Sequence, residues 1–474
     1  MLRIGGISKK SAHLFPFATK AKTVISITLQ LFRMNFLAKL KAHIFSEIVL
    51  AALFLMVPAI INGSPFYDFD SGDYIDSGIR LSASLSRPMF YSLFILVTSL
   101  GFSLWLTVFC QSMLLAWSLK QLLISLELNR PKCLLILTLA LTILTPIGRL
   151  SGQIMSDVFT TILLILGSAW LIGGPKWLNQ NKFLLPLIAF SFSTHLGHFF
   201  LLLVFIPFMA YRHGKSGIVE NWKTLLRLGL YLCAIILGSL AINHGKVKRL
   251  TLSPAAEAFQ ISKLAHTGAL QEYLKENCEQ SSNFYCAYKD SIPNDFNTFL
   301  WSERSPMVKA GGIRNGWQIN ESTIAQVKAS DAAMKVHYKG VQDDFIQQCK
   351  SNSWLVGWFV DSENTGKVLQ RHFPMHFWWA KNARFDKLQL HAVIDPIFRG
   401  ALIVSILYML FALVKPSFPQ ERLWLLAIFA LVFINHLSVA FLSIPDNRLA
   451  ARVTVVLVIP ILVRVIRRMN PTHH

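Results

Sequence analysis

Charged residues are scarce in this chain, and acidic residues are scarcer than basic ones. Only 15% of the 474 residues are charged and 53% are hydrophobic, with 46 Lys and Arg against 25 Asp and Glu. A soluble protein carries about 25% charged and about 45–50% apolar residues. The composition therefore excludes an ordinary soluble protein. Several apolar runs reach the roughly 20 residues that cross a bilayer, so we expect an all-α polytopic membrane protein.

Other absences exclude further classes of function. No Cys-x-x-Cys or histidine pair has the spacing of a zinc site. No basic patch with interleaved aromatic residues lies outside the loops between apolar runs, so we expect no nucleic-acid partner. The net charge of +21 instead indicates topology, because Lys and Arg collect on the cytoplasmic side of membrane spans.

The apolar runs predict about ten transmembrane helices. They lie near residues 44–61, 92–119, 133–147, 157–173, 184–194, 196–211, 224–242, 397–414, 421–442 and 449–464. Residues 183–211 could form one long span or a hairpin of two short helices, because Ser, Thr and His residues interrupt the middle. The hairpin keeps all the basic loops on one side of the membrane, so the positive-inside rule favours it.

This topology divides the chain into four parts. Residues 1–43 form a cytoplasmic basic N-terminal segment, and residues 44–242 form an N-terminal membrane module with an acidic first outer loop at 62–91. Residues 243–396 are the only long polar region and predict a mainly helical extracytoplasmic domain. Residues 397–474 supply the C-terminal membrane helices. If the polar domain lies outside the cytoplasm, its Cys278 and Cys286 can form a disulfide; in the cytoplasm they stay free thiols.

Four carboxylates within nine residues mark the first outer loop: Asp68, Asp70, Asp73 and Asp76. Carboxylates at a membrane surface can deprotonate a hydroxyl, hold a divalent cation or bind sugar hydroxyls. The alternative is a solvated turn that caps a helix, since Asp-Ser-Gly-Asp is also turn chemistry. Asp157 enters the fourth span on the same face of the membrane, and it too has a helix-capping alternative.

Basic residues on this outer face suggest an anion site. Arg448 lies in a very short loop between two spans, and Arg452 lies one turn further into the membrane. A charge inside a span is a functional hypothesis by default, and arginine binds phosphate bidentately. Arg87 lies in the first outer loop. His195, in the hairpin turn, either is a buried structural histidine or faces the same cavity and contacts substrate.

Several of these elements together resemble the GT-C superfamily, the polytopic glycosyltransferases that use polyprenyl-phosphate sugars. The resemblance rests on Asp-x-x-Asp-Tyr (Asp70, Asp73, Tyr74), Pro-Met-Phe-Tyr (Pro88 to Tyr91), Asp157, Thr-His-Leu-Gly (Thr194 to Gly197) and Pro-Asp-Asn-Arg (Pro445 to Arg448). The chain has Arg448-Leu449 where many relatives have Arg-Tyr, and it lacks their adjacent acidic pair. The choice between Asp70 and Asp73 therefore stays open.

The resemblance implies a transferase that moves a sugar from a polyprenyl-phosphate carrier to an acceptor hydroxyl outside the cytoplasm. A first-loop aspartate, Asp70 or Asp73, would be the catalytic base, with a divalent cation as an optional cofactor. Asp157, Arg87, His195, Arg448 and Arg452 would bind substrate. The acceptor would be an envelope glycan, lipid or protein, and the location a bacterial inner membrane. The alternative is a polytopic transporter or lipid flippase without transferase activity, which a broken hairpin and an intramembrane arginine suit equally well.

Overall fold

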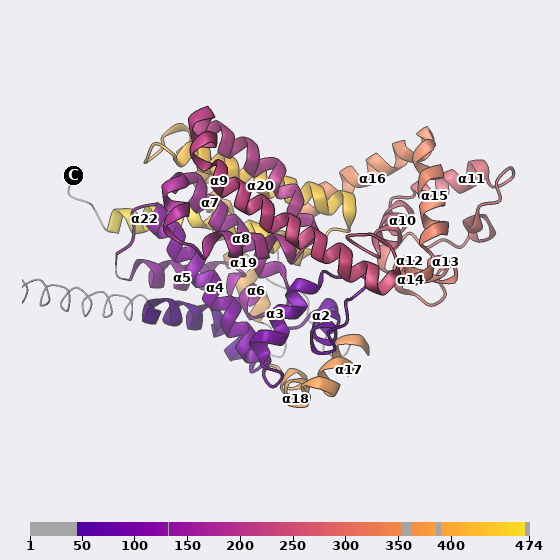
Figure 1. Cartoon of the computed structure of the whole chain (residues 1–474), viewed down its shortest axis with the longest axis horizontal. Coiled ribbons are helices and arrows are strands. Elements are labelled where there is room, and N and C mark those ends of the chain that lie inside the picture. The colour runs from indigo at the N-terminus through magenta and orange to yellow at the C-terminus, as the bar shows by residue number, and fades with distance from the viewer. Residues whose placement is uncertain (1–44, 131, 352–362, 385–389, 470–474) are drawn as a thin grey trace, which may run out of the picture.

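The described part of the chain is entirely helical. The structure is a computed structural model that describes residues 45–130, 132–351, 363–384 and 390–469 (Figure 1). These ranges contain no β-strand, only an isolated bridge between Phe66 and Gln153. The expected all-α class is therefore confirmed. The predicted basic segment 1–43 lies outside the described residues.

Seven helices in the described ranges are long and apolar enough to cross a membrane. They are Phe45–Asn62, Leu104–Ser125, Asp157–Gly174, Trp222–Val247, Ala392–Val414, Glu421–Leu442 and Asn447–Met469. A bent pair, Leu184–Ser193 with Leu196–Arg212, raises the number to eight if it counts as one span. The protein is thus a helical membrane protein, and the count of ten stays a prediction.

The sequence prediction of one span at 92–119 is wrong. Two helices occupy this region, α3 (Met89–Ser99) and α4 (Leu104–Ser125). Leu100 and Gly101 between them both adopt left-handed backbone conformations, with φ of 51° and 73°. Such residues end a helix at its C-terminus. Apolar residues continue on both sides of the break, and Gly101 with Ser99 and Ser103 is a weak signal there, because Gly is also common within membrane helices.

Residues 183–211 bend sharply, as the predicted hairpin requires, and its two membrane crossings stay a prediction. Helix α8 (Leu184–Ser193) and the helical stretch Leu196–Arg212 meet at 119°. A short 3-10 turn, η1 (Leu196–His198), leads into α9 (Phe199–Val247). The backbone of α9 leaves the helical conformation at Gly214 (φ 59°), where the helix kinks. The polar residues of the turn are largely buried in protein, as non-helical backbone at membrane depth requires.

Two short helices complete the region between the first spans. Helix α5 (Cys133–Leu144) leads to α6 (Ile147–Gly152), which packs closely against the first span. A Cβ atom on Gly148 would lie 2.9 Å from Pro58, and one on Gly152 would lie 2.9 Å from Ala59. Small residues at such contacts let membrane helices approach each other.

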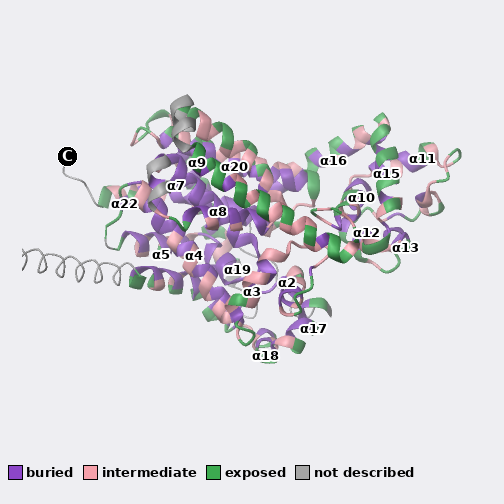
Figure 2. Cartoon of the chain, viewed as in Figure 1, coloured by how far each residue is buried: buried purple, intermediate pink, exposed green. Residues whose placement is uncertain are grey.

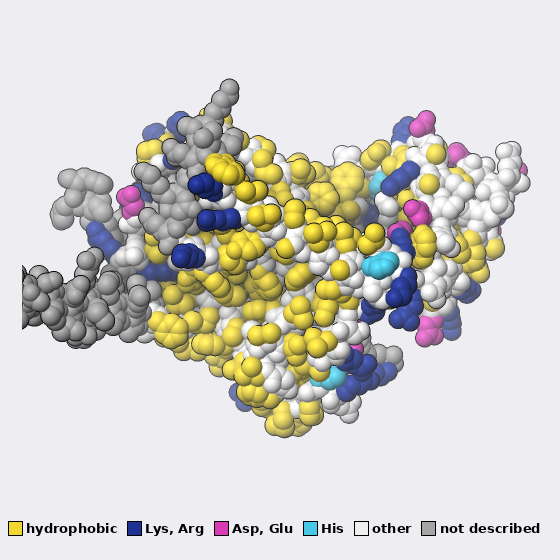
Figure 3. All heavy atoms as spheres, in the orientation of Figure 1, with side chains coloured by type: hydrophobic (Ala, Val, Ile, Leu, Met, Phe, Trp, Pro, Cys, Tyr) yellow, Lys and Arg dark blue, Asp and Glu magenta, His cyan; other side chains and the backbone are white. Residues whose placement is uncertain are grey.

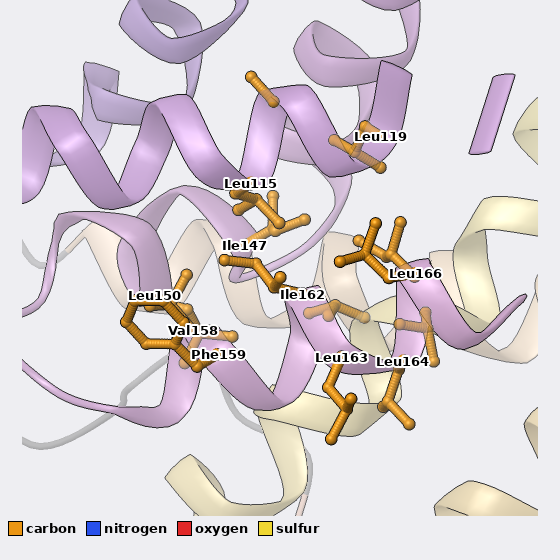
Figure 4. Packing of buried hydrophobic residues seen from close by; sticks show 14 of the residues in the cluster. Leu115, Leu119, Ile147, Leu150, Val158, Phe159, Ile162, Leu163, Leu164 and Leu166 are labelled. Carbon is orange, nitrogen blue, oxygen red and sulfur yellow. The ribbon is translucent and has the colours of Figure 1, made fainter. Parts of the chain in front are cut away.

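The membrane core forms around α4 and α7 (Asp157–Gln180). Figure 4 shows Leu115 and Leu119 of α4 facing Ile147 of α6 and Ile162 of α7. Figure 2 shows the same interior as largely buried, with exposed residues along the outside of the bundle. Because lipid is as apolar as leucine, close packing rather than burial from water holds these helices together.

The two ends of the bundle differ. Arg467 of α22 (Ile459–Met469) donates to the Leu126 carbonyl at 3.0 Å and lies over the Phe418 ring, so three loop regions meet at one end. The helical domain of residues 256–350, which we call the outer domain because it lies outside the helix bundle, is at the opposite end (Figures 1 and 3). Hydrophobic side chains cover the bundle between the ends, whereas charged side chains gather at both ends in the view of Figure 3.

The outer domain has its own core. Its helices are α10 (Ala256–His266), α11 (Ala269–Asn277), η2 (Phe284–Tyr288), α12 (Phe296–Trp301), α13 (Pro306–Lys309), α14 (Gly312–Asn315), α15 (Trp317–Ala329) and α16 (Asp331–Lys350). Buried residues between Ala258 and Ala333 form this core. The disulfide predicted between Cys278 and Cys286 is present.

The rest of the predicted domain 243–396 packs against the membrane part instead. Helices α17 (Glu363–His372) and α18 (Pro374–Lys381) contribute Leu369 and Phe373 to the membrane core. The final helices are α19 (Leu390–Val414), α20 (Glu421–Leu442), α21 (Asn447–Thr454), η3 (Val455–Val458) and α22.

Candidate functional site

The acidic first loop folds into a helix, α2 (Phe69–Ile79). Asp68 is its N-cap, and the Asp68 backbone N–H donates to the Ser71 hydroxyl at 2.8 Å, which is the reciprocal bond of a capping box. Gly72 has no side chain, so α17 can approach α2 closely. The Gly72 N–H donates to Thr365 Oγ1 of α17 at 3.1 Å. Asp68 is thus the capping residue, whereas the predicted catalytic acids Asp70 and Asp73 lie within the helix.

Hydrogen bonds join the first outer loop to the second. The Ile154 N–H donates to the Phe66 carbonyl at 2.9 Å, and the Ser71 hydroxyl donates to the Ile154 carbonyl at 2.9 Å. The Tyr74 hydroxyl lies 3.0 Å from Ser156 Oγ. These contacts place α2 beside the start of α7, where Asp157 is the first residue.

Three aspartates and three arginines alternate at this point, and we call them the Asp–Arg cluster. Its members are Asp68, Asp70, Asp157, Arg87, Arg448 and Arg452. They come from four separate segments of the sequence. The sequence predicted all of them except Asp68 as site residues, so the fold assembles most of the predicted site.

Arg448 is the centre of the cluster. Its Nη1 lies 3.2 Å from Asp70 Oδ2 and 3.4 Å from Asp68 Oδ1, and its Nε lies 3.7 Å from Asp157 Oδ2. Asp70 also forms an ion pair with Arg87. One guanidinium group thus holds carboxylates from both outer loops together.

Arg452 forms the deeper half of the cluster. Its Nη1 donates to Asp157 Oδ1 at 3.0 Å and its Nη2 donates to Asn435 Oδ1 at 3.0 Å. Arg452 and Asp157 are each only 3% exposed. A buried charge pair of this kind is tolerated only when both partners are well bonded.

The two acids at the outer edge have opposite electrostatic environments. Burial raises the pKa of Asp68 to about 6, although Arg448 acts against it, and Asp70, Asp446 and Asp157 raise it further. Burial also raises the pKa of Asp70, but Arg87 and Arg448 outweigh it and hold that pKa below the ordinary value. Asp70 therefore stays ionised at neutral pH, while Asp68 takes up a proton near pH 6.

The arginines retain unused hydrogen-bond donors. In the described ranges, the buried Nε–H groups of Arg87, Arg448 and Arg452 donate no hydrogen bond. Buried donors are rarely left without a partner in folded proteins. Of the three, Arg87 also lines the adjacent cleft, so an anion there, such as a phosphate group, would accept from its guanidinium.

A small, partly open cleft lies next to Arg87. The loop 85–90, the hairpin residues Ser193 and Leu196, and one face of α9 near Ile235 and Ser239 line it. Only 6% of the apolar window within Trp222–Val247 is buried, so this part of α9 faces outward. The cleft therefore combines an apolar wall, a few hydroxyl groups and one arginine.

Asp73 and Asp76 lie outside the cluster. Asp73 accepts from the Asn364 amide at 2.9 Å and from the Ser86 hydroxyl at 3.3 Å, and no Lys or Arg of the described ranges lies within ion-pair distance. Asp76 lies 2.9 Å from both Arg80 Nε and His372 Nε2. Asp73 is thus the acid of α2 with no Lys or Arg of the described ranges at ion-pair distance, and Lys246 interacts with it only at longer range.

His195 lies between Ser193 and Leu196, which line the cleft, but it neither lines the cleft nor joins the cluster. Its Nδ1 accepts the Gly197 N–H at 3.1 Å, which shapes the hairpin turn. The buried His198 lies between Thr160, at 2.6 Å, and the Ser191 carbonyl, at 2.7 Å. His198 fits the structural alternative, and substrate contact by His195 stays a prediction.

No group of three metal-binding side chains converges anywhere in the described residues. The carboxylates of the cluster are already bound by arginines. This donor set fits an anion better than a divalent cation.

No family model, curated protein or solved structure matches this chain.

Sequence reasoning missed several residues that support the site. Thr365 and Asn364 bind α2 from the far side, and Gln348 binds the loop before Arg448. Asn435 had a usable signal, since it is an amide in an apolar span. The others are ordinary polar residues in a polar region and carry no signal in the sequence.

Proposed function

We propose that this protein is a membrane glycosyltransferase that moves a sugar from a polyprenyl-phosphate carrier to an acceptor hydroxyl. The observation that carries the proposal is the Asp–Arg cluster, with its unused arginine donors, beside an apolar cleft. A lipid-linked phosphate needs both features at one place. The proposal places the reaction on the extracytoplasmic face of a bacterial inner membrane, with an envelope glycan, lipid or protein as acceptor.

The arginines would bind the carrier phosphate. Arg87 lines the cleft and Arg448 lies one carboxylate away, with Asp70 between them. Arginine offers paired N–H donors that match phosphate oxygens. Asp70 would keep the two guanidinium groups in place before the phosphate arrives, so that little reorganisation is needed during the reaction.

Asp73 would be the base. It lies one helical turn from Asp70 on α2, and no Lys or Arg of the described ranges forms an ion pair with it. The acceptor oxygen attacks the anomeric carbon, and the bond from that carbon to the phosphate oxygen breaks. The phosphate leaves with the electron pair, and Asp73 takes the hydroxyl proton. A single displacement inverts the anomeric centre.

Donor consumption in detergent tests this function. Purified protein is incubated with radiolabelled polyprenyl-phosphate sugars and an envelope extract as acceptor. Loss of a general base costs typically 10²–10⁴-fold, so we expect Asp73→Asn to lose at least about 100-fold. The exposed Asp343→Asn, on α16, serves as control. Well-expressed Asp70→Asn and Asp73→Asn variants that both keep full transfer activity would refute the proposal.

The second candidate is a transporter or lipid flippase. The bent pair α8–α9 and the intramembrane Arg452–Asp157 pair favour it, because broken helices and buried charges line transport paths. A flippase moves its substrate only across a sealed membrane. Donor that stays intact in detergent but crosses proteoliposomes would favour this candidate over the transferase.

A further inference from the structure

We propose that Gln348 and Lys263 of the outer domain are positioning residues that fix Arg448 in the Asp–Arg cluster. They bind the two ends of the turn 443–446, which connects α20 to α21. The identity of the anion that Arg448 binds rests on the proposed function. The positioning itself depends only on the contacts below.

Gln348 binds one residue of this turn with both ends of its amide. Its Oε1 accepts the Asp446 N–H at 2.8 Å, and its Nε2 donates to the Asp446 carbonyl at 3.2 Å. Gln348 is completely buried, whereas its neighbours Gln347 and Cys349 on α16 are exposed. A buried glutamine amide whose donor and acceptor both bind one backbone unit fixes that unit in position and orientation.

Lys263 binds the other end. Its Nζ donates to the Ser443 carbonyl at 2.6 Å and forms an ion pair with Asp344. Lys263 is 2% exposed, and His266 lies 3.3 Å from the same aspartate. Burying an ammonium group is costly unless it is paired, and here the pairing aims the charge at a single backbone carbonyl.

The turn passes this constraint directly to Arg448. Asp446 caps α21, and its Oδ1 accepts the Arg448 N–H at 2.6 Å. Ile444 packs against the core of the outer domain. The Arg448 guanidinium contacts three carboxylates at 3.2–3.7 Å, so a shift of about 1 Å in the turn would break hydrogen-bonding distance. The outer domain thus belongs to the anion site, although it supplies no member of the cluster.

The two hydrogen bonds between Gln348 and Asp446 form what we call the clamp. Gln348→Met tests it, since methionine fills a similar volume without either hydrogen bond. Gln347→Met, one residue away and exposed, is the matched control. The probe is decaprenyl phosphate in detergent. Loss of two hydrogen bonds of about 0.5–1.5 kcal/mol each predicts affinity about tenfold weaker in Gln348→Met. The control should bind like the wild type.

A double-variant cycle separates positioning from general destabilisation. In an Arg448→Ala background, Gln348→Met should cause no further loss of affinity, because the group it positions is gone. A tenfold loss in that background as well, or unchanged affinity in Gln348→Met alone, would overturn the proposal. If Gln348→Met does not fold, Gln348→Glu replaces it, since it keeps the acceptor and sets two oxygens against each other.

Backbone hydrogen exchange without ligand tests the clamp independently of the function. Exchange at the Asp446 and Arg448 amides should be about tenfold faster in Gln348→Met than in Gln347→Met. Faster exchange with no decaprenyl phosphate binding in the wild type would support the clamp and reject the carrier. Equal exchange in both variants would reject the clamp itself.

Discussion

At the residue scale, the most deeply buried charge pair shows the desolvation cost of the cluster. Asp157 and Arg452 lie inside the helix bundle, and Asn435 is the one further hydrogen-bond partner of the Arg452 guanidinium in the described residues. The desolvation of both charges is compensated only while both are present. This arrangement makes each residue dependent on the other.

Removing one partner should therefore destabilise the protein strongly. We expect Asp157→Asn to lower the free energy of unfolding by about 3–5 kcal/mol, because it leaves Arg452 buried without a counter-charge. The double variant Asp157→Asn/Arg452→Met should recover most of the loss. Unfolding in detergent, followed by circular dichroism, measures both. Single variants within about 0.5 kcal/mol of the wild type would contradict a coupled pair.

Asp68 should make anion binding depend on pH. Its pKa of about 6 lies above the ordinary value, so the folded protein gains a proton as the pH falls through 6, and folding stability declines as the pH rises from about 4 to 6. The proton removes a negative charge beside Arg448. We expect a polyprenyl-phosphate sugar, whose phosphodiester does not titrate here, to bind about three- to tenfold tighter at pH 5 than at pH 7.5.

Titration calorimetry across this range measures the effect, with Asp68→Asn as the comparison. That variant should bind with nearly constant affinity between pH 5 and 7.5. If it keeps the pH dependence of the wild type, another group is responsible.

The structure brings together those predicted site residues whose charge is costly in apolar surroundings. Asp157, Arg448 and Arg452 are charges next to apolar runs, so physical reasoning selects them without a structure. The sequence could not distinguish Asp70 from Asp73, because their partners come from residues 448 and 364. Partners that distant along the chain leave no local pattern.

At the element scale, α2 depends on its contact with α17. A Cβ atom on Gly72 would lie 2.9 Å from the Thr365 backbone, closer than a packed contact allows. The Thr365 hydroxyl also donates to the Asp68 carbonyl at 2.9 Å. Helix α17 thus supports the acidic helix from the side opposite the cluster.

Gly72→Ala should separate these two helices. Overpacking costs about 1–3 kcal/mol, and we expect that loss of stability together with reduced donor consumption. Gly400→Ala is the control, since open space surrounds Gly400 on α19, and alanine there should be neutral or slightly stabilising. Thermal unfolding compares them; equal midpoints for both variants would show that the α2–α17 contact is not close.

Element breaks were predictable only where several polar residues mark them. The bend after α8 falls at Ser-Thr-His, and the sequence reveals it. The break between α3 and α4 falls at Leu100-Gly101 inside an apolar run. Gly101 with Ser99 and Ser103 is a weaker signal, because Gly is also common within membrane helices, so the two helices looked like one span.

At the whole-molecule scale, the disulfide bears on which side of the membrane the outer domain occupies. The Cys278–Cys286 bond closes a short loop, and such bonds persist in oxidising compartments. This agrees with the predicted extracytoplasmic location, and the same face would then carry the Asp–Arg cluster.

Thiol labelling in intact cells tests this location. A membrane-impermeant maleimide should label Cys278 and Cys286 only after mild reduction from outside. Replacing both by serine should cost about 2.5 kcal/mol of stability by loop-closure entropy. Labelling that requires cell lysis would place the domain in the cytoplasm and reverse the topology.

Photo-crosslinking tests the central claim most directly, namely that the Asp–Arg cluster and the adjacent cleft bind a lipid-linked phosphate. A polyprenyl phosphate with a diazirine in its first isoprene unit is irradiated with the purified protein, and crosslinked peptides are mapped. We predict adducts in residues 85–90 and 235–243 that unlabelled carrier competes away. Arg448→Ala should abolish them, while Arg422→Ala, at the opposite end of the bundle, should not. Adducts elsewhere, or adducts undiminished in Arg448→Ala, would contradict the claim.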